Sequence, residues 1–276
     1  MSRPSGASWI NGRSGRWIDC RDRGLHYGDG LFETMRVRDR RIRLLDYHLD
    51  RLLEGCGRLG IDTPGESVLR RELASPARLR DDAVLKLILT RGAGARGYRP
   101  SGEERCTRLV TLARLPPLAP GDAPQRVRMC ATRLGSNPAL AGLKTLNRLE
   151  SVLARLEWRS ARIWEGLMCD AEGNVVCGTM SNLFVRSGST LKTPMLDRCG
   201  IAGVMRRWVL EQARELHLRP WQGRLGFEEV AAADEVFMTN AVAGIVSISM
   251  LERVGRRFPI KRSDAAQRLR ARLELE

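Results

Sequence analysis

One proline-dense stretch, at residues 115–124, separates two long regions in which apolar and polar residues alternate regularly. Proline has a fixed φ and no amide hydrogen, so such a stretch neither continues a helix nor joins the interior of a sheet. We therefore predict a linker at residues 115–124, between a smaller N-terminal α+β domain (residues 1–114) and a larger C-terminal domain (residues 125–276). A chain of 276 residues has room for two hydrophobic cores of this kind.

The first region has the patterns of both strands and helices. Residues 1–40 have the composition of short strands and turns, and apolar residues at helical spacing predict a helix at residues 45–59. Strands are expected at residues 17–19, 31–37, 83–90 and 108–113.

The second region repeats this mixture. A helix is expected at residues 147–159, and another follows residues 200–206 and reaches residue 216. Strands are expected at residues 125–132, 165–169, 175–177, 182–186 and 235–238. The fold class is therefore α+β in both parts.

Composition excludes several kinds of protein. The net charge is +15, but the basic residues are dispersed and aromatic residues make up only 5%, so nucleic-acid binding is not expected. Attraction of small anionic substrates is a better use of this charge. No apolar run approaches the roughly 20 residues of a membrane helix, and the start lacks a signal-peptide core. Seven isolated cysteines and three scattered histidines predict a cytoplasmic protein without a metal site.

Lysine is scarce in this chain. Of 47 basic residues only four are lysines, namely Lys86, Lys144, Lys192 and Lys261. Arginine stays protonated, whereas a partly buried lysine loses its proton readily and attacks carbonyl groups. Lys86 lies in an apolar strand pattern and is predicted to point outward. Lys144 lies in Leu-Ala-Gly-Leu-Lys-Thr-Leu-Asn-Arg-Leu-Glu at residues 140–150, which makes it the candidate to bind an aldehyde cofactor.

Four segments together resemble the fold-type IV pyridoxal-phosphate enzymes, the class IV aminotransferases. They are residues 22–34, 91–98, 140–150 and 181–184. The first and last are typical of the whole fold type, and the middle two indicate the aminodeoxychorismate lyases within it. The resemblance extends over residues 10–248. It implies a two-domain α+β fold like that of D-amino-acid aminotransferase, with the cofactor between the domains and the larger C-terminal domain binding it.

The resemblance assigns cofactor-binding roles to several residues. Lys144 matches the lysine that forms a Schiff base with pyridoxal 5'-phosphate, and Arg51 matches the phosphate-binding arginine. The backbone amides of Val204 and Met205 would donate to the phosphate at a helix N-terminus. Taken alone, Arg51 would be interpreted as a solvated helix charge.

Other positions match less specific parts of the family pattern. Asn240 corresponds to a further phosphate contact, and Ile201 to an apolar residue that packs on the pyridine ring. Thr34 corresponds to a threonine near the cofactor that could relay a proton, although a strand residue without a role is the alternative. Arg96 and Tyr98 would bind substrate carboxylates from the glycine-rich loop, unless that loop is only a hairpin turn.

One position departs from the family. The strand before Ser-Asn-Leu-Phe usually carries a glutamate that keeps the pyridine nitrogen protonated, and here the aligned residue is Cys177. A thiol is a weak donor and normally uncharged, so it cannot hold a pyridinium as a carboxylate does. The cofactor should then be a weaker electron sink. This handicaps transamination more than a lyase reaction that is driven by aromatisation.

The resemblance therefore implies a lyase that converts 4-amino-4-deoxychorismate to 4-aminobenzoate and pyruvate in folate biosynthesis. It also implies a homodimer. The alternative is a D-amino-acid or branched-chain aminotransferase of the same fold. A basic binding protein without enzymatic activity would need a grouped positive face, which the sequence does not show.

Overall fold

The computed structural model describes residues 7–117, 123–261 and 264–275. The chain divides into two compact units. Unit 1 comprises Met1–Pro117 and Leu143–Asn147, and unit 2 comprises Leu118–Gly142 and Arg148–Glu276.

The first division falls between Pro117 and Leu118, inside the stretch predicted as a linker. Residues 118–122 of that stretch lie outside the described residues. The segment Leu143–Asn147 comes after the proline-dense stretch in the sequence, but its contacts assign it to unit 1. Lys144 is therefore a residue of unit 1.

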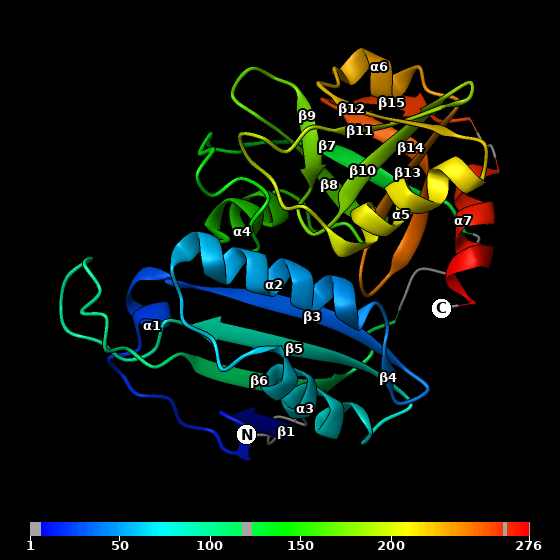
Figure 1. The fold of residues 1–276 in the computed structure, drawn as a ribbon. Coiled ribbons are helices and arrows are strands. Elements are labelled where there is room, and N and C mark those ends of the chain that lie inside the picture. Colours follow the sequence, from blue (N-terminus) through cyan, green and yellow to red (C-terminus); the bar gives the residue numbers. More distant parts are fainter. Residues whose placement is uncertain (1–6, 118–122, 262–263, 276) are drawn as a thin grey trace. The chain divides into compact units, whose positions relative to one another are not determined.

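Unit 1 is a six-stranded antiparallel sheet with helices α2 and α3 packed against it (Figure 1). The strand order is β2-β1-β6-β5-β3-β4. In chain order its elements are β1 (Ala7–Ile10), β2 (Arg13–Ser14), α1 (Arg23–Tyr27), β3 (Gly30–Arg38), β4 (Arg41–Ile42), α2 (Leu45–Leu59), α3 (Glu66–Ala77), β5 (Asp82–Thr90) and β6 (Thr107–Arg114).

Alternation along the strands explains why one face of this sheet is buried. In β3 the odd-numbered residues from Leu31 to Val37 are buried, and those between them are half-buried. In β5 the odd-numbered residues are buried in the same way. The apolar residues among them pack with Leu49 and Leu52 of α2 in one hydrophobic cluster, and each fully buried leucine contributes about 1.5–3 kcal/mol. The even-numbered residues of β3 and β5 lie on the other face.

Unit 2 is built on a nine-stranded sheet with the order β12-β11-β10-β13-β14-β7-β8-β9, and β15 pairs with β14. Because β9 also pairs with β10, the strands β10, β13, β14, β7, β8 and β9 form a closed ring. In chain order its elements are β7 (Gln125–Arg133), α4 (Leu149–Leu156), β8 (Glu165–Cys169), β9 (Val175–Gly178), β10 (Asn182–Ser187), β11 (Thr190–Pro194), α5 (Val204–Glu215), β12 (Arg219–Gly223), α6 (Phe227–Ala231), β13 (Glu235–Asn240), β14 (Gly244–Arg253), β15 (Arg256–Pro259) and α7 (Ala265–Leu273).

Most predicted elements are confirmed. The strands expected in the first region beyond residue 30 are β3, β5 and β6, and the expected helix is α2. In the second region the expected strands are β7, β8, β9, β10 and β13, and the helix after residues 200–206 is α5.

One prediction was wrong, and one predicted helix is shorter than expected. Residues 17–19 form no strand, and the short helix α1 follows them instead, with the Asp22 side chain accepting from the amide of Gly24. Helix α4 spans Leu149–Leu156 rather than residues 147–159. Just after its end, the Glu157 carboxylate accepts from the amides of Ala131 and Thr132 on β7, at 2.8 Å each.

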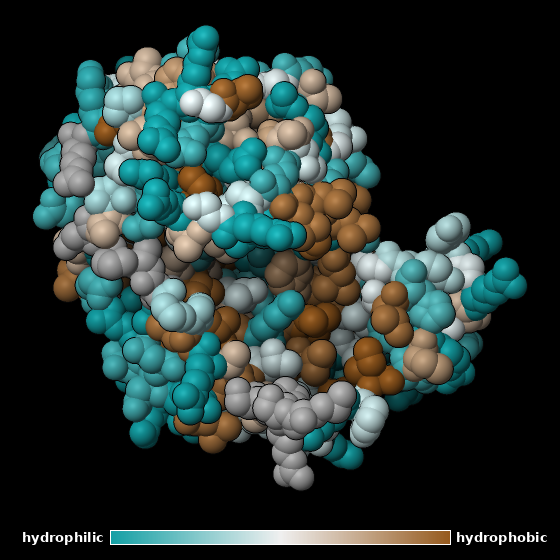
Figure 2. Space-filling model, turned by 180° about the vertical axis from the view of Figure 1, so that it is seen from behind, coloured by the Kyte–Doolittle hydropathy of each residue, from teal (hydrophilic) through white to brown (hydrophobic). Residues whose placement is uncertain are grey.

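Hydrophilic residues cover much of the face drawn in Figure 2, and hydrophobic residues gather into separate patches on it. Four of the exposed large hydrophobic side chains belong to α4: Leu149, Val152, Leu153 and Leu156. Within the described ranges, no helix has the length and apolar character needed to cross a bilayer.

Candidate active site

Lys144 lies on a short segment that pairs with the edge of β3. The Phe32 amide donates to the Lys144 carbonyl at 3.0 Å, and Leu31 and Thr145 form an antiparallel bridge. This register places Lys144 directly opposite Phe32. Opposite residues of an antiparallel pair project from the same face, so Lys144 lies on the half-buried face of β3.

An aromatic ring holds the Lys144 ammonium. Its Nζ lies 4.2 Å from the centroid of the Phe32 ring, within the range of a cation–π attraction. Thr34 comes two residues after Phe32, projects from the same face and is half-buried. The structure thus places both predicted catalytic residues, Lys144 and Thr34, on one face of β3.

A buried ionic network occupies the opposite face of β3. Glu33 Oε2 accepts from His48 Nδ1 at 2.6 Å, and Glu33 Oε1 accepts from Arg51 Nε at 2.8 Å. The Nη2 group of Arg51 donates a second bond to this carboxylate. The side chains of His48 and Glu33 are 1% and 2% exposed. Arg51 is nearly buried and oriented by Glu33, so it is not the solvated helix charge that its sequence context alone would predict.

The charge state of this network follows from its contacts. Burial opposes ionisation of Glu33, but the positive charge of Arg51 and the hydrogen bond from His48 outweigh it and hold the Glu33 pKa at about 2. Burial lowers the pKa of His48, so the imidazole is neutral at neutral pH and donates through Nδ1. His48 Nε2 is buried and has no hydrogen-bond partner among the described residues.

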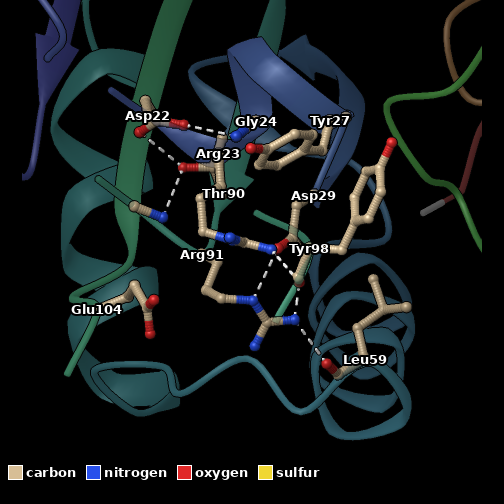
Figure 3. Close-up of polar contacts among 12 residues, drawn as sticks. Asp22, Arg23, Gly24, Tyr27, Asp29, Leu59, Thr90, Arg91, Tyr98 and Glu104 are labelled. Carbon is tan, nitrogen blue, oxygen red and sulfur yellow. Dashed lines mark hydrogen bonds and ion pairs between the residues drawn. The ribbon is translucent and has the colours of Figure 1, made fainter. Parts of the chain in front are cut away.

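Residues 22–34 contact the glycine-rich loop at residues 91–98 and hold it in place (Figure 3). Arg23 pairs with Asp29 at 2.8 Å and donates to the carbonyls of Gly97 and Tyr98 at 2.8 and 2.7 Å. Arg91 pairs with the same Asp29 at 2.8 Å. Burial would raise the pKa of Asp29, but Arg91 and Arg23 together keep it below its ordinary value.

The predicted substrate residues of this loop gather near α1. Arg96 lines a cleft of about 890 Å³ together with Arg21 and Tyr27. The Tyr98 side chain is 85% exposed, and its ring centroid lies 5.4 Å from that of Tyr27. Across the described residues, no hydrogen bond or ring contact joins Arg96 or Tyr98 to Lys144. A role for these two residues in substrate binding stays a prediction.

In unit 2, the Asn182 side chain fixes the backbone just before α5. Asn182 Oδ1 accepts from the Gly203 amide at 3.1 Å, and Asn182 Nδ2 donates to the Ile201 carbonyl at 2.9 Å. A Cβ at position 203 would lie 2.1 Å from Asn182 Oδ1, so only glycine fits there. The next amides, of Val204 and Met205, lie in the first turn of the helix, where no intrahelical acceptor is available. These amides and the helix dipole suit a phosphate.

Thr239 and Asn240, at the end of β13, differ in the hydrogen bonds of their side chains. Thr239 is directly opposite Asn182 in the β10–β13 pairing and therefore projects from the same face. Its hydroxyl is buried and has no partner in the described part of the chain. The Asn240 side-chain oxygen Oδ1 instead accepts from the amides of Val242 and Ala243, at 3.0 and 2.7 Å, and closes a turn. A buried hydroxyl without a partner is the kind of group that a bound ligand satisfies.

Cys177 lies in β9 and is buried. Burial raises the pKa of its thiol far above the ordinary value, so Cys177 is uncharged at neutral pH. Glu165 on β8 does not replace the missing carboxylate. Its oxygens accept from the hydroxyls of Thr179 and Ser181, at 2.6 and 2.8 Å, and from the Met180 amide at 3.1 Å. These bonds hold the turn before β10.

Comparison with known proteins identifies the family. Residues 30–251 match the amino-transferase class IV family. The chain belongs to this family. It is 33% identical to the aminodeoxychorismate lyase of Vibrio harveyi, over 87% of this chain and 90% of that protein. It is 32% identical to a putative branched-chain-amino-acid aminotransferase of Methanocaldococcus jannaschii, over 82% and 80%.

A solved structure supports the same assignment. The crystal structure of 4-amino-4-deoxychorismate lyase from Pseudomonas aeruginosa matches with a TM-score of 0.91 and 42% identity, covering 98% of both chains. The resemblance inferred from the four sequence segments is confirmed, and so is the α+β fold of the class IV family.

Sequence reasoning missed four residues that shape these sites: Glu33, His48, Asn182 and Thr239. For Glu33 a signal was present, because a charged residue alternates with Leu31 and Met35 on the buried face of a predicted strand. Such a charge must be paired when buried. For Thr239 the sequence held no signal, since its importance depends on a cross-strand neighbour 57 positions earlier, Asn182.

Proposed function

We propose that this class IV protein is a pyridoxal-phosphate-dependent carbon–oxygen lyase that converts 4-amino-4-deoxychorismate to 4-aminobenzoate and pyruvate. The observation that carries the proposal is the position of Lys144, paired to β3 and held over the Phe32 ring on the same face as Thr34. The similarity to lyases of Vibrio harveyi and Pseudomonas aeruginosa supports this reaction over others of the family.

The residues present fit the cofactor. Lys144 would bind its aldehyde, and the amides of Val204 and Met205 would donate to its phosphate together with the unsatisfied hydroxyl of Thr239. Arg51 would add a fixed positive charge that Glu33 holds in orientation.

Three further contacts come from the family pattern. Ile201, whose carbonyl is fixed by Asn182, would pack on the pyridine ring. The Asn240 side chain is committed to its own turn, so we assign its phosphate contact to the backbone. Cys177 would face the ring nitrogen.

The proposed chemistry uses two side chains on the β3 face. Pyridoxal phosphate, when bound, supplies an electron sink for negative charge at the carbon next to the substrate nitrogen. The Lys144 amine, once the substrate amine has replaced it, takes the proton from ring carbon 4. The leaving enolpyruvate receives a proton from Lys144 or from the Thr34 hydroxyl. The ring becomes aromatic when enolpyruvate leaves, which drives the step.

Cys177 favours this lyase over the alternative aminotransferase. Its neutral thiol does not stabilise a protonated pyridine, and Glu165 is fully engaged in holding a turn. Transamination needs the stronger electron sink, whereas aromatisation supplies the lyase with its own driving force. An aminotransferase acting on D- or branched-chain amino acids is the second candidate, since a relative of that name matches at 32% identity.

We also propose that the protein is a homodimer that works in the cytoplasm in folate biosynthesis. Helix α4 supports self-association, because Leu149, Val152, Leu153 and Leu156 recur at helical spacing and are 51–77% exposed. The cysteines are free thiols, as a reducing compartment requires.

The decisive experiment is product analysis. The purified protein, loaded with pyridoxal phosphate, is incubated with aminodeoxychorismate and, separately, with a panel of D- and branched-chain amino acids plus a keto acid. We expect 4-aminobenzoate and pyruvate in equal amounts. Borohydride reduction of the loaded protein should leave the cofactor attached to Lys144. Products from the amino-acid panel alone, or an adduct on Lys86, would contradict the proposal.

A further inference from the structure

The Phe32 ring is held in register with the amine on which the proposed reaction depends. The Phe32 amide donates to the Lys144 carbonyl at 3.0 Å. One residue further along each strand of this pairing, Leu31 and Thr145 form an antiparallel bridge. The backbone therefore fixes the ring and the lysine side chain on one face of β3, and neither can shift along the strand without breaking the pairing.

This ring distinguishes the two protonation states of the amine. The Lys144 Nζ lies over the Phe32 ring, 4.2 Å from its centroid. The negative face of an aromatic ring attracts an ammonium group, whereas a neutral amine carries no charge for it to attract. The contact therefore stabilises the protonated form of Lys144 relative to its neutral amine.

Other charged groups lie on the same sheet face. The Nζ of Lys86, on β5, is 5.0 Å from the centroid of the same ring, and as a second cation it opposes protonation of Lys144. Further along the strands, Arg36 pairs with Asp82 at 2.8 Å. None of these groups changes when the ring alone is replaced.

The charges on the opposite face of β3 are also independent of the ring. Glu33 and Arg51 pair with each other there. Burial lowers the pKa of His48, and the charges of Arg51 and Lys144 add to this effect. Because all these groups remain when the ring is replaced, a comparison of variants at this one position isolates the contribution of the ring.

We infer that Phe32 is a positioning residue that stabilises the protonated form of Lys144 during the reaction. The inference rests on the proposed lyase function. In that reaction Lys144 takes the proton from ring carbon 4, and the electron pair of that bond stays with the ring. The carbon–oxygen electron pair leaves with enolpyruvate, which then receives a proton from Lys144 or through Thr34. By favouring the ammonium form, the Phe32 ring makes Lys144 the stronger base for the first transfer. It also holds the proton on the face that carries Thr34.

The test compares Phe32→Leu, which removes the ring but keeps apolar bulk, with Phe32→Tyr, which keeps a ring. The control is Phe258→Leu, which removes a half-buried ring in unit 2 that packs edge-on against Phe227. Each protein is freed of cofactor, and the rate at which added pyridoxal phosphate forms its Schiff base is followed by absorbance as a function of pH. This rate depends on the fraction of Lys144 that is neutral amine.

We expect the midpoint of the pH profile to fall by about one pH unit in Phe32→Leu, because the ring no longer stabilises the ammonium form. Below the midpoint this variant should therefore load cofactor faster than the wild type, a gain that general damage to the site would not produce. Phe32→Tyr should restore the wild-type midpoint, and Phe258→Leu should not move it. Turnover of aminodeoxychorismate by loaded Phe32→Leu should fall by about threefold, since base strength enters the rate only in part.

The outcomes separate this inference from the proposed function. An unchanged midpoint in Phe32→Leu, or slower loading at every pH, overturns the inference. A lowered midpoint with unchanged turnover overturns the role of the ring in the reaction. Failure of the wild type to convert aminodeoxychorismate overturns the proposed function, whereas the loading profile tests the contact between the ring and Lys144 without any substrate.

Discussion

Replacing Glu33 with glutamine tests the buried network that orients Arg51. In the wild type the Glu33 carboxylate accepts from His48 Nδ1 at 2.6 Å and twice from Arg51. Glu33→Gln keeps the side-chain volume and one acceptor oxygen but removes the negative charge. Arg51 then remains as a nearly buried cation without its carboxylate. Breaking a buried pair in this way costs about 3–5 kcal/mol.

We expect the free energy of unfolding to fall by about 3 kcal/mol in Glu33→Gln. This is the lower end of that range, because the Arg51 side chain is 12% exposed. Urea unfolding followed by circular dichroism measures it. With a slope of about 2 kcal/mol per molar urea, the midpoint should fall by about 1.5 M. The control is Glu66→Gln, which removes a carboxylate from an exposed pair with Arg70 and should cost less than about 1 kcal/mol.

The same pair of proteins gives a pH signature. The Glu33 pKa is depressed from 4.5 to about 2, so its contribution to stability is fully present above pH 4.5 and is lost as pH falls towards 2. The difference in unfolding free energy between wild type and Glu33→Gln should therefore be constant from pH 8 to 5 and shrink below that. The network would not be a source of stability if Glu33→Gln proved as stable as Glu66→Gln. The same conclusion would follow if the difference in unfolding free energy between wild type and Glu33→Gln did not change in acid.

Three further substitutions test the cofactor and the dimer. Arg51→Ala should weaken retention of pyridoxal phosphate by about 2 kcal/mol, measured as cofactor content after dialysis, and unchanged content would exclude Arg51 from phosphate binding. Cys177→Glu should raise slow transamination of amino acids at least tenfold, for which about 1.4 kcal/mol suffices, with less effect on lyase turnover. Flat transamination with the cofactor bound would mean that Cys177 does not control the electron sink. Leu153→Glu should turn a dimer into a monomer by light scattering, and an unchanged mass would show that α4 is not the contact.

The sequence predicted the elements that depend on local patterns. The apolar spacing of α2 and the alternation of β3 and β5 arise within single segments, and both patterns are strong. Helix α3 was missed although Leu69, Leu73 and Ala77 recur at a spacing of four, because its short apolar stripe is diluted by charged residues. The pairing of β9 with both β8 and β10 could not be predicted, since local pattern does not specify which strands meet.

The sequence predicted only those site residues that lie within its motifs. The motifs identified Lys144, and the structure explains why its neighbours matter, since the register with β3 places it on the Phe32 and Thr34 face. The anchoring of the glycine-rich loop by Arg23 and Asp29 depends on contacts between segments about 70 residues apart. No spacing rule gives such contacts. Thr239 stands out only in the structure, where its buried hydroxyl has no hydrogen-bond partner among the described residues.

At one interior site of this fold, burial favours arginine over lysine. Arg206 is buried at the first turn of α5, where it donates to the Pro194 carbonyl and to Gln222, and burial lowers its pKa to about 10. An arginine that starts at 12.5 stays charged under that penalty. A lysine has a lower ordinary pKa than an arginine, so the same burial would cost it more of its charge at neutral pH. A cation buried as deeply as Arg206 is therefore better supplied by arginine than by lysine.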